Sequence, residues 1–230
     1  MTFRIGVIGA GAHGTRYARH AARDVPGMGL AAVCRRSGNP GRLLAAELDC
    51  VYHEEPAALI ADPGVDGVVI ATPPSSHCEL AVAALEAGKP VLVEKPMTGT
   101  LVEARRLAAV DTSSAIMVGQ ALRWNPVLRK VKELWPRLGR VHMVRGAQRL
   151  APTTLGWQRN IAETLGGSVH LTGVHIYDPV RWLTGAQFVS VYSRQRQVMN
   201  PVVEDHFLTR AELSDGCWAN CEVCKYTDSR

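Results

Sequence analysis

Three residues near the middle of the chain, Glu94, Lys95 and Pro96, directly follow the short apolar run 91–93. A strand that ends in this way places its last residues at the carboxyl edge of a sheet, where ligands bind in open α/β folds. A lysine in surroundings of low dielectric can hold a polar group of a substrate and bias its protonation. Lys95 is therefore a candidate catalytic residue, with Glu94 beside it as a candidate binding residue.

A glycine-rich loop occupies residues 9–14, which read Gly-Ala-Gly-Ala-His-Gly. In such a loop the first glycine makes a tight turn, the second lets the backbone approach a pyrophosphate, and the third lets the helix pack closely on the strand. The pyrophosphate itself sits at the helix N-terminus. Because this loop follows an apolar run and opens an amphipathic one, it predicts a dinucleotide-binding site.

The end of the second expected strand indicates which dinucleotide is bound. An Asp or Glu at this point would bind the adenine ribose hydroxyls and repel a 2′-phosphate. The chain instead has Arg35, Arg36 and Ser37. Two guanidiniums and a hydroxyl can neutralise and bind a 2′-phosphate, so the sequence favours NADP(H) over NAD(H). Exposed arginines on an ordinary loop are the alternative.

The first half of the chain alternates between apolar runs and amphipathic segments. Continuous apolar runs are typical of strands that are buried on both faces. Their alternation with helices implies right-handed crossovers and a parallel, doubly wound sheet, that is, a Rossmann fold. We expect strands over residues 3–8, 30–34, 67–70, 90–93 and 115–118, and helices over 13–24, 40–48, 75–87 and 100–109.

The second half of the chain has a different pattern, with long strands and few helices. This pattern predicts a shortened α+β domain with a mainly antiparallel sheet. The expected domains are therefore 1–120, which binds the dinucleotide, and 121–230, which serves substrate binding and oligomerisation. In the second domain we expect helices over 126–138 and 168–183, and strands over 140–148, 187–196, 203–213 and 217–226.

Composition places the chain among globular proteins. It has 230 residues, of which 47% are hydrophobic, and a formal net charge of +5. Acidic residues are interspersed with the basic ones, so no nucleic-acid partner is expected. The basic stretch 123–149 is read either as a solvated face or as a patch that faces an anionic cofactor or substrate. No apolar run is long enough to span a bilayer, and we expect a cytoplasmic protein without a membrane partner.

Three cysteines near the end of the chain have the C-x3-C-x2-C spacing of radical S-adenosylmethionine iron–sulfur ligands. They follow Asp215-Gly216, which is a hairpin signal. In a strand Cys217 and Cys221 share one face and Cys224 lies on the other, so the three cannot converge on one cluster. No other group has a compact ligand pattern, and no metal site is expected.

With these residues assembled, the chain resembles the Gfo/Idh/MocA family, which includes glucose–fructose oxidoreductase and inositol dehydrogenase. The resemblance implies a Rossmann domain followed by an α+β domain whose open sheet mediates oligomerisation. It also implies hydride transfer between a nicotinamide cofactor and a sugar, cyclitol or related polyol or ketone. The matching segments are 9–14, 71–77, 94–96, 123–126, 166–167 and 173–178.

The resemblance also assigns roles to individual residues. Lys95 would touch both the cofactor ribose and the substrate, and His175 would transfer the proton. These roles make chemical sense, because a histidine titrates near neutral pH and a lysine can stabilise negative charge on the reacting oxygen. The candidate cofactor-binding residues are Gly9, Gly11, Ala12, His13, Gly14, Arg35, Arg36, Ser37, Thr72, Pro73, His77, Glu94 and Lys95, of which Thr72, Pro73 and His77 would line the nicotinamide side.

Four residues of the second domain are candidates for substrate binding: Arg123, Trp157, Arg159 and Asp178. An aromatic face and a guanidinium suit a polyol or an acidic sugar, although Trp157 is as readily a core residue. Asp178 follows His175 by three positions, so it could orient the imidazole. Alternatively, Asp178 caps a helical segment that restarts at Pro179.

The chain departs from the family pattern in three ways. Relatives with a Lys, Asp, His triad place the aspartate four residues before the histidine, where this chain has Leu171. The adjacent His170 points about 100° away on a helix, and Pro179 is expected to kink that helix. The chain is also shorter than most relatives, so we expect its last strand to be an edge that another subunit covers. Two functions stay open: an NADP-dependent oxidoreductase acting on CH-OH groups, or a non-catalytic dinucleotide-binding sensor or degenerate family member.

Overall fold

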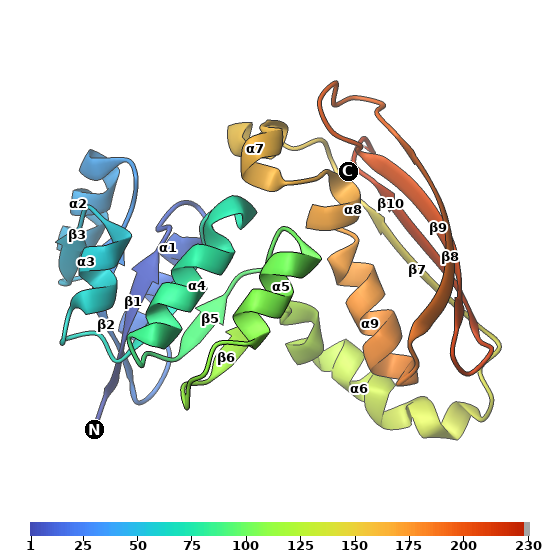
Figure 1. The fold of residues 1–230 in the computed structure, drawn as a ribbon, viewed down its shortest axis with the longest axis horizontal. Helices are drawn as coiled ribbons and strands as arrows, with labels where there is room; N and C mark the ends of the chain where they lie inside the picture. The colour runs from blue at the N-terminus through green and yellow to red at the C-terminus, as the bar shows by residue number, and fades with distance from the viewer. Residues whose placement is uncertain (228–230) are drawn as a thin grey trace. The chain divides into compact units, whose positions relative to one another are not determined.

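The computed structural model describes residues 1–227 (Figure 1). The chain divides into two compact units, Met1–Gly119 and Gln120–Arg230. Within the described residues, no helix combines the length and the apolar character needed to cross a membrane.

The first unit is a six-stranded parallel sheet with the strand order β3-β2-β1-β4-β5-β6. The order reverses between β1 and β4, which creates the switch point where ligands of doubly wound sheets bind. The strands are β1 (Phe3–Ile8), β2 (Met28–Cys34), β3 (Val51–His53), β4 (Gly67–Ile70), β5 (Val91–Val93) and β6 (Ile116–Val118). The helices are α1 (Gly14–Arg23), α2 (Gly38–Glu47), α3 (Pro56–Ala61), α4 (His77–Glu86), α5 (Leu101–Ala108) and the 3-10 turn η1 (Pro74–Ser76).

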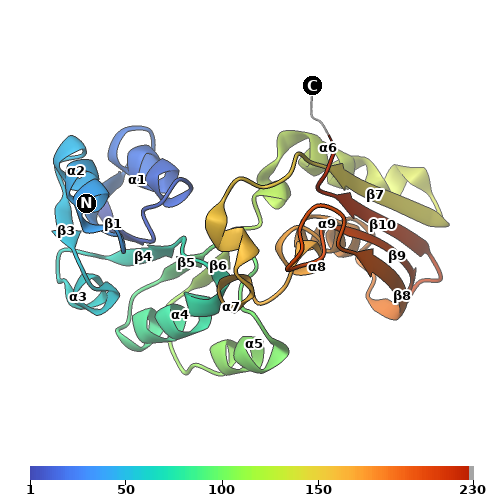
Figure 2. The same cartoon turned by 90° about the horizontal axis from the view of Figure 1, so that it is seen from above.

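Helices cover both faces of this sheet (Figure 2). Adjacent residues of β1 point to opposite sides, and both Val7 and Ile8 are at most 1% exposed. Val7 packs in a cluster with Ala18 of α1 and Leu44 of α2, whereas Ile8 packs in another with Ala81 of α4. Burial on both faces explains why the strand sequences are continuous apolar runs.

The Rossmann architecture predicted from the sequence is confirmed. All five expected strands are present, and β2 begins two residues earlier than expected. Strand β3 and helix α3 were not predicted. They are only three and six residues long, which is too short for a periodic pattern to stand out.

The second unit contains a four-stranded sheet with the order β7-β10-β9-β8. Strand β10 pairs parallel with β7 and antiparallel with β9, so the sheet is mainly antiparallel, as predicted. The strands are β7 (Met143–Arg149), β8 (Phe188–Arg196), β9 (His206–Leu213) and β10 (Trp218–Cys224). The helices are α6 (Pro126–Leu134), α7 (Ile161–Thr164), α8 (Ser168–Leu171) and α9 (Val174–Thr184), with 3-10 turns η2 (Ala121–Trp124), η3 (Trp135–Leu138) and η4 (Gly156–Arg159).

Helix α9 lies across one face of this sheet (Figure 1). Its buried residues Ile176 and Val180 pack in one cluster with Phe207 of β9 and Val223 of β10. On the opposite face of the sheet, the side chains of Leu208 and Trp218 are more than half exposed.

The structure differs from the sequence-based expectations for the second unit in its helices and in the place of its last strand. The helix expected over 168–183 is two helices, because the chain turns at Thr172 and Gly173, where a Cβ on Gly173 would lie 2.3 Å from the Val169 carbonyl oxygen. The alternative in which Asp178 caps a helical segment that restarts at Pro179 is wrong: α9 continues through Pro179, which is buried like Ile176 and Val180. Asp178 is therefore inside the helix and caps nothing.

The last strand, β10, is not an edge, because it lies between β7 and β9, and the edges are β7 and β8. The expected hairpin at Asp215-Gly216 does join β9 to β10, with Gly216 at φ +80°. Helix α6 ends at Leu134, before the expected Leu138, since Pro136 follows and the chain continues as a 3-10 turn. Cys217, Cys221 and Cys224 are all buried, and no described group of three or more His, Cys, Asp or Glu residues could hold a metal ion.

Candidate functional site

The glycine loop lies at the carboxyl end of β1, at the switch point of the sheet. A Cβ on Gly9 would lie 2.7 Å from the Thr72 nitrogen, and one on Gly14 would lie 2.2 Å from the Gly9 oxygen. The fold therefore requires glycine at both positions. A Cβ on Gly11 would meet nothing nearer than 4.0 Å, so the space beside Gly11 is open. This open side next to the N-terminus of α1 fits a pyrophosphate.

Arg35, Arg36 and Ser37 follow β2 at the same edge of the sheet. The Cys34 carbonyl accepts hydrogen bonds from the backbone nitrogens of Gly9, at 3.0 Å, and Ala10, at 3.1 Å. The segment that contains Arg35 and Arg36 therefore starts next to the glycine loop. The hydroxyl of Tyr52 donates to the Arg35 carbonyl at 3.2 Å, which fixes the backbone at this point.

His77 links two loops at the sheet edge and is only 1% exposed. Its Nδ1 lies 2.8 Å from the Pro96 carbonyl oxygen, and its Nε2 lies 2.8 Å from that of Thr72. Burial lowers the pKa of the imidazole, and the two carbonyls act in the opposite direction. His77 therefore ties the loop after β4, with Thr72 and Pro73, to the loop that contains Lys95. Its implied place beside the nicotinamide stays a prediction.

Glu94 and Lys95 directly follow β5, as the sequence indicated. Burial of the Glu94 carboxyl raises its pKa, but hydrogen bonds from His13, Tyr17 and the Lys95 backbone outweigh this effect, so its pKa lies below the usual value. For Lys95, removal from solvent lowers the pKa of the amine, and the charge of Glu94 raises it. The net result is a lysine that gives up its proton at a lower pH than an exposed one.

Tyr17, which sequence reasoning missed, belongs to this group. Its hydroxyl donates to Glu94 Oε1 at 2.6 Å. The imidazole of His13 bonds to the same oxygen. The sequence signal for Tyr17 is weak: it lies one helical turn after His13, at the start of α1, so the two side chains lie on the same side.

In the second unit, Arg123 and Asp178 bind each other. The Nε and Nη2 atoms of Arg123 lie 2.9 and 2.6 Å from the two carboxylate oxygens of Asp178. This bidentate pair anchors η2 on α9, the helix that carries His175 near its start. The carboxylate expected to orient His175 is thus engaged by Arg123 at both oxygens, and its proposed contact with substrate stays a prediction.

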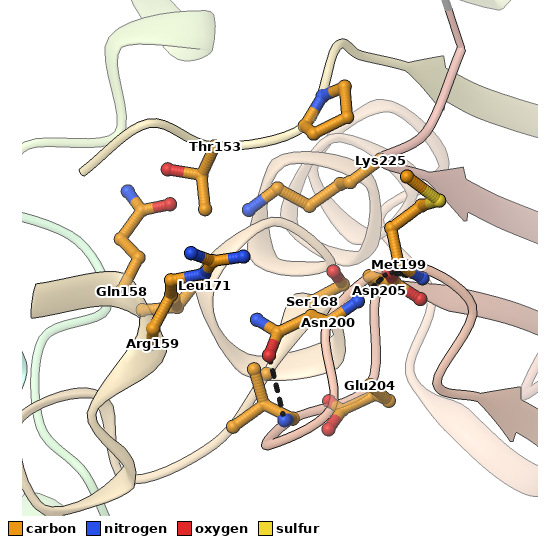
Figure 3. Close-up of a pocket in the computed structure, with 13 residues that line it drawn as sticks. Thr153, Gln158, Arg159, Ser168, Leu171, Met199, Asn200, Glu204, Asp205 and Lys225 are labelled. Atoms are coloured by element: carbon orange, nitrogen blue, oxygen red, sulfur yellow. Dashed lines mark hydrogen bonds between the residues drawn. The ribbon is translucent and has the colours of Figure 1, made fainter. Parts of the chain in front are cut away.

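A pocket lies within the second unit, next to α8 (Figure 3). The side chains of Arg159 and Lys225 point into it, and Leu171 forms part of its wall. Of the four candidate substrate-binding residues, only Arg159 lines this pocket. The polar residues that the sequence analysis missed are Thr153, Gln158, Ser168, Asn200, Glu204, Asp205 and Lys225.

Both carboxylates of this pocket accept hydrogen bonds from backbone nitrogens. Asp205 accepts hydrogen bonds from the backbone nitrogens of three consecutive residues, 198–200, at 2.7–2.8 Å. Glu204 accepts one from the Val169 nitrogen at 3.1 Å, and a Cβ on Gly167 would lie 2.3 Å from its Oε2. Glu204 therefore fills the space beside Gly167, just before α8, and a side chain at position 167 would not fit there.

A glycine loop at the switch point of a parallel sheet, with a lysine at the same edge, defines a Rossmann-type dinucleotide-binding protein. The chain belongs to the Gfo/Idh/MocA oxidoreductase family. The family model for the oxidoreductase family with an NAD-binding Rossmann fold matches residues 3–120, and the model of the GFO/IDH/MocA C-terminal domain matches residues 129–230.

Two curated relatives and one solved structure illustrate the likeness. The chain is 33% identical to inositol 2-dehydrogenase 1 of Saccharopolyspora erythraea over 83% of its length, and 30% identical to scyllo-inositol 2-dehydrogenase (NAD(+)) of Bacillus subtilis over 96%. It spans 57% of the length of the first relative and 67% of the second. The crystal structure of GenD2 from gentamicin A biosynthesis in complex with NAD is 29% identical, with a TM-score of 0.95 over all of this chain and 67% of that one.

Proposed function

We propose that the protein is a nicotinamide-dependent dehydrogenase or reductase that acts on a CH-OH group of a cyclitol, a sugar or a related polyol or ketone. The observation that carries this proposal is Lys95, a partly buried amine at the edge of the sheet that also carries the glycine loop. The names of the curated relatives, inositol 2-dehydrogenases, support the substrate class.

The proposed chemistry divides the work between two residues. Oxidation of a secondary alcohol removes a hydride from carbon and a proton from oxygen, and a bound nicotinamide supplies the hydride acceptor. The imidazole of His175 takes the hydroxyl proton, and returns it in the reverse direction. The Lys95 ammonium stabilises the negative charge that develops on that oxygen.

The pocket of the second unit suits a hydroxylated substrate. The side-chain oxygens of Thr153 and Asn200 accept backbone hydrogen bonds from Leu155 and Val202, which leaves their donor groups for a ligand. Gln158 offers both a donor and an acceptor, and together these groups suit the recognition of hydroxyls. We place the substrate against this pocket and Arg159, and retain Trp157, Arg123 and Asp178 as proposed contacts.

The test of this function is turnover. The purified chain is incubated with NADP⁺ or NAD⁺ and a panel of cyclitols and sugars, and formation of reduced nicotinamide is followed by its absorbance. Time-dependent, substrate-dependent reduction supports the proposal.

We also propose that NADP(H) is preferred, although relatives are described with NAD. The support is the pair Arg35 and Arg36 where an acidic residue would bind ribose hydroxyls. We expect the double substitution Arg35→Asp, Arg36→Ala to weaken NADPH binding about 10²- to 10⁴-fold, because two charged hydrogen bonds are removed and each contributes about 1.5–3 kcal/mol. Fluorescence titration with NADPH and NADH measures the change.

The matched control for this substitution is Arg106→Ala, which removes an exposed arginine of α5 that pairs with Glu79 of α4. The control should leave both affinities unchanged. If the ratio of NADPH to NADH affinity is the same in the double variant and the wild type, Arg35 and Arg36 do not bind the 2′-phosphate.

We propose that the open face of the four-stranded sheet joins two copies of the chain. Its support is exposed apolar side chains, among them Leu208 and Trp218, on a face that none of the described helices of the unit covers. Light scattering is expected to give a mass of two or more copies, and Leu208→Asp to lower it. A monomeric wild type contradicts the proposal.

One observation favours a second candidate, a dinucleotide-binding sensor without turnover. Leu171 is 5% exposed and apolar where relatives with the triad have an aspartate. Tight NADPH binding without turnover on the whole panel would favour this candidate.

A further inference from the structure

The Glu94 carboxylate accepts hydrogen bonds from three segments of the first unit. Its Oε1 lies 2.6 Å from the Tyr17 hydroxyl of α1 and 2.8 Å from Nε2 of His13 in the glycine loop. Its Oε2 lies 3.0 Å from the Lys95 backbone nitrogen, just after β5. One carboxylate therefore joins the glycine loop, the first helix and the turn after β5 at one edge of the sheet.

This carboxylate is buried, and its surroundings suit its ionised form. Glu94 is 8% exposed, and burying a carboxylate is costly unless hydrogen bonds compensate. Burial raises the pKa of Glu94, but the hydrogen bonds outweigh this effect and bring it below the usual value. Burial and the hydrogen bond to Glu94 raise the pKa of the Tyr17 phenol far above its usual value, so Tyr17 donates and Glu94 accepts. The backbone also closes around this group, because a Cβ on Gly119 would lie 3.1 Å from Glu94 Oε1.

His13 connects the carboxylate with the start of α1. It is the N-cap residue of this helix, yet its side chain makes no capping hydrogen bond. The imidazole instead bonds to Glu94 and packs edge-on against the Tyr17 ring, with 5.4 Å between the ring centroids. An N-cap side chain ordinarily accepts a hydrogen bond from a backbone nitrogen of the first turn. Because Glu94 holds the imidazole elsewhere, the N-cap side chain does not compete with an anion for these nitrogens.

We propose that Glu94 is a positioning residue of the dinucleotide site: through Tyr17 and His13 it holds the glycine loop and the start of α1 in the arrangement that receives the pyrophosphate. In this role Glu94 acts through its neighbours and needs no contact with the cofactor. The support is the shared Oε1, the burial of the carboxylate, and the N-cap side chain that bonds to it. The role rests on the proposed use of a nicotinamide dinucleotide, but it concerns binding of the cofactor and not the hydride step.

Tyr17→Phe tests this role directly, because it deletes one donor to Glu94 and keeps the ring that packs against His13. The pyrophosphate is common to NADPH and NADH, so a loosened loop should weaken the binding of both by the same factor. We expect each Kd to rise about 10-fold, the size of one lost hydrogen bond to a charged group, in fluorescence titrations with the two dinucleotides. Their ratio should stay as in the wild type, which separates this role from that of Arg35 and Arg36.

Glu94→Gln should have a larger effect, about 10- to 100-fold on each Kd, because an amide has one acceptor oxygen and cannot serve all three donors. If this variant does not fold, a measurement on Tyr17→Phe without any ligand gives a second test. Backbone hydrogen exchange of residues 9–16, read by mass spectrometry, should be faster in Tyr17→Phe than in the wild type, since the loop is then held less firmly.

The matched control is Arg19→Ala, which removes a side chain of α1 that pairs with Glu47 of α2. This change loosens the same helix without touching the glycine loop, so both Kd values and the exchange of residues 9–16 should stay as in the wild type. If Tyr17→Phe binds both dinucleotides as the wild type does, or if Arg19→Ala weakens binding as much, Glu94 is merely structural and the proposal fails. That result leaves the proposed function intact, whereas a wild type that binds neither dinucleotide contradicts both.

Discussion

Replacement of Lys95 by methionine is expected to lower kcat for hydride transfer by about 10²–10³-fold, the usual effect of removing one donor that stabilises charge on a reacting oxygen. Methionine keeps the length of the side chain and removes the ammonium. Because Lys95 is also a candidate contact of the cofactor ribose, the Kd of NADPH should rise as well, but by less than kcat falls, since the loss of one hydrogen bond corresponds to about 10-fold. Steady-state kinetics and fluorescence titration give the two quantities.

The role of the Lys95 ammonium in stabilising charge predicts that the activity depends on pH. Removal from solvent lowers the pKa of Lys95, and the protonated amine is the active form. Activity should therefore be lost on the alkaline side at a pH below about 10.4, the ordinary lysine value. Lys95→Arg, which keeps the charge, is the companion variant: its activity should persist to higher pH. Full activity in Lys95→Met, with normal stability, would remove Lys95 from the chemistry.

The second large effect is expected for His175→Gln, which keeps hydrogen-bonding capacity and removes the titratable imidazole. A positioned general base contributes about 10²–10⁴-fold, so kcat should fall by that order while NADPH binding is kept. The loss should shrink as the pH rises, because hydroxide and solvent then compete for the substrate proton.

The control for His175→Gln is His142→Gln, an exposed histidine of the same unit, which should leave kcat unchanged. If His175→Gln is as active as the control, another group moves the proton, and His170 on α8 is the next histidine to replace. Leu171 makes this comparison important, since the usual aspartate partner of the histidine is replaced.

The sequence was sufficient for the framework of the first unit. Strands such as β1 and β4 are continuous apolar runs because both of their faces are buried, and the glycine loop directly follows the first of them. Strand β3 was missed because its three residues are exposed or partly buried, so the apolar signal that identifies a central strand is weak in this edge strand.

In the second unit the elements were easier to predict than their connections. The strands β8, β9 and β10 were expected, but local pattern does not determine strand order, and β10 lies between β7 and β9. The break between α8 and α9 depends on the close approach of Gly173 to the Val169 carbonyl, a contact that no periodicity reveals.

The sequence predicted only part of the candidate site, because local patterns do not show which distant residues meet. Lys95 and the glycine loop could be found because each directly ends or follows a strand. The bonds from His13 and Tyr17 to Glu94, and the pairing of Arg123 with Asp178, join residues 55 to 81 positions apart. Such contacts depend on how the elements pack in three dimensions, which local sequence patterns do not reveal.

The central claim, hydride transfer to or from a hydroxylated substrate, is tested most directly by following nicotinamide reduction with the purified chain. The panel contains scyllo-inositol, other cyclitols and neutral and acidic sugars, each with NADP⁺ and NAD⁺, and Lys95→Met serves as the matched control. We predict reduction with at least one cyclitol or sugar, faster with NADP⁺ and lost in Lys95→Met. Tight cofactor binding with no reduction on any member of the panel would contradict the claim.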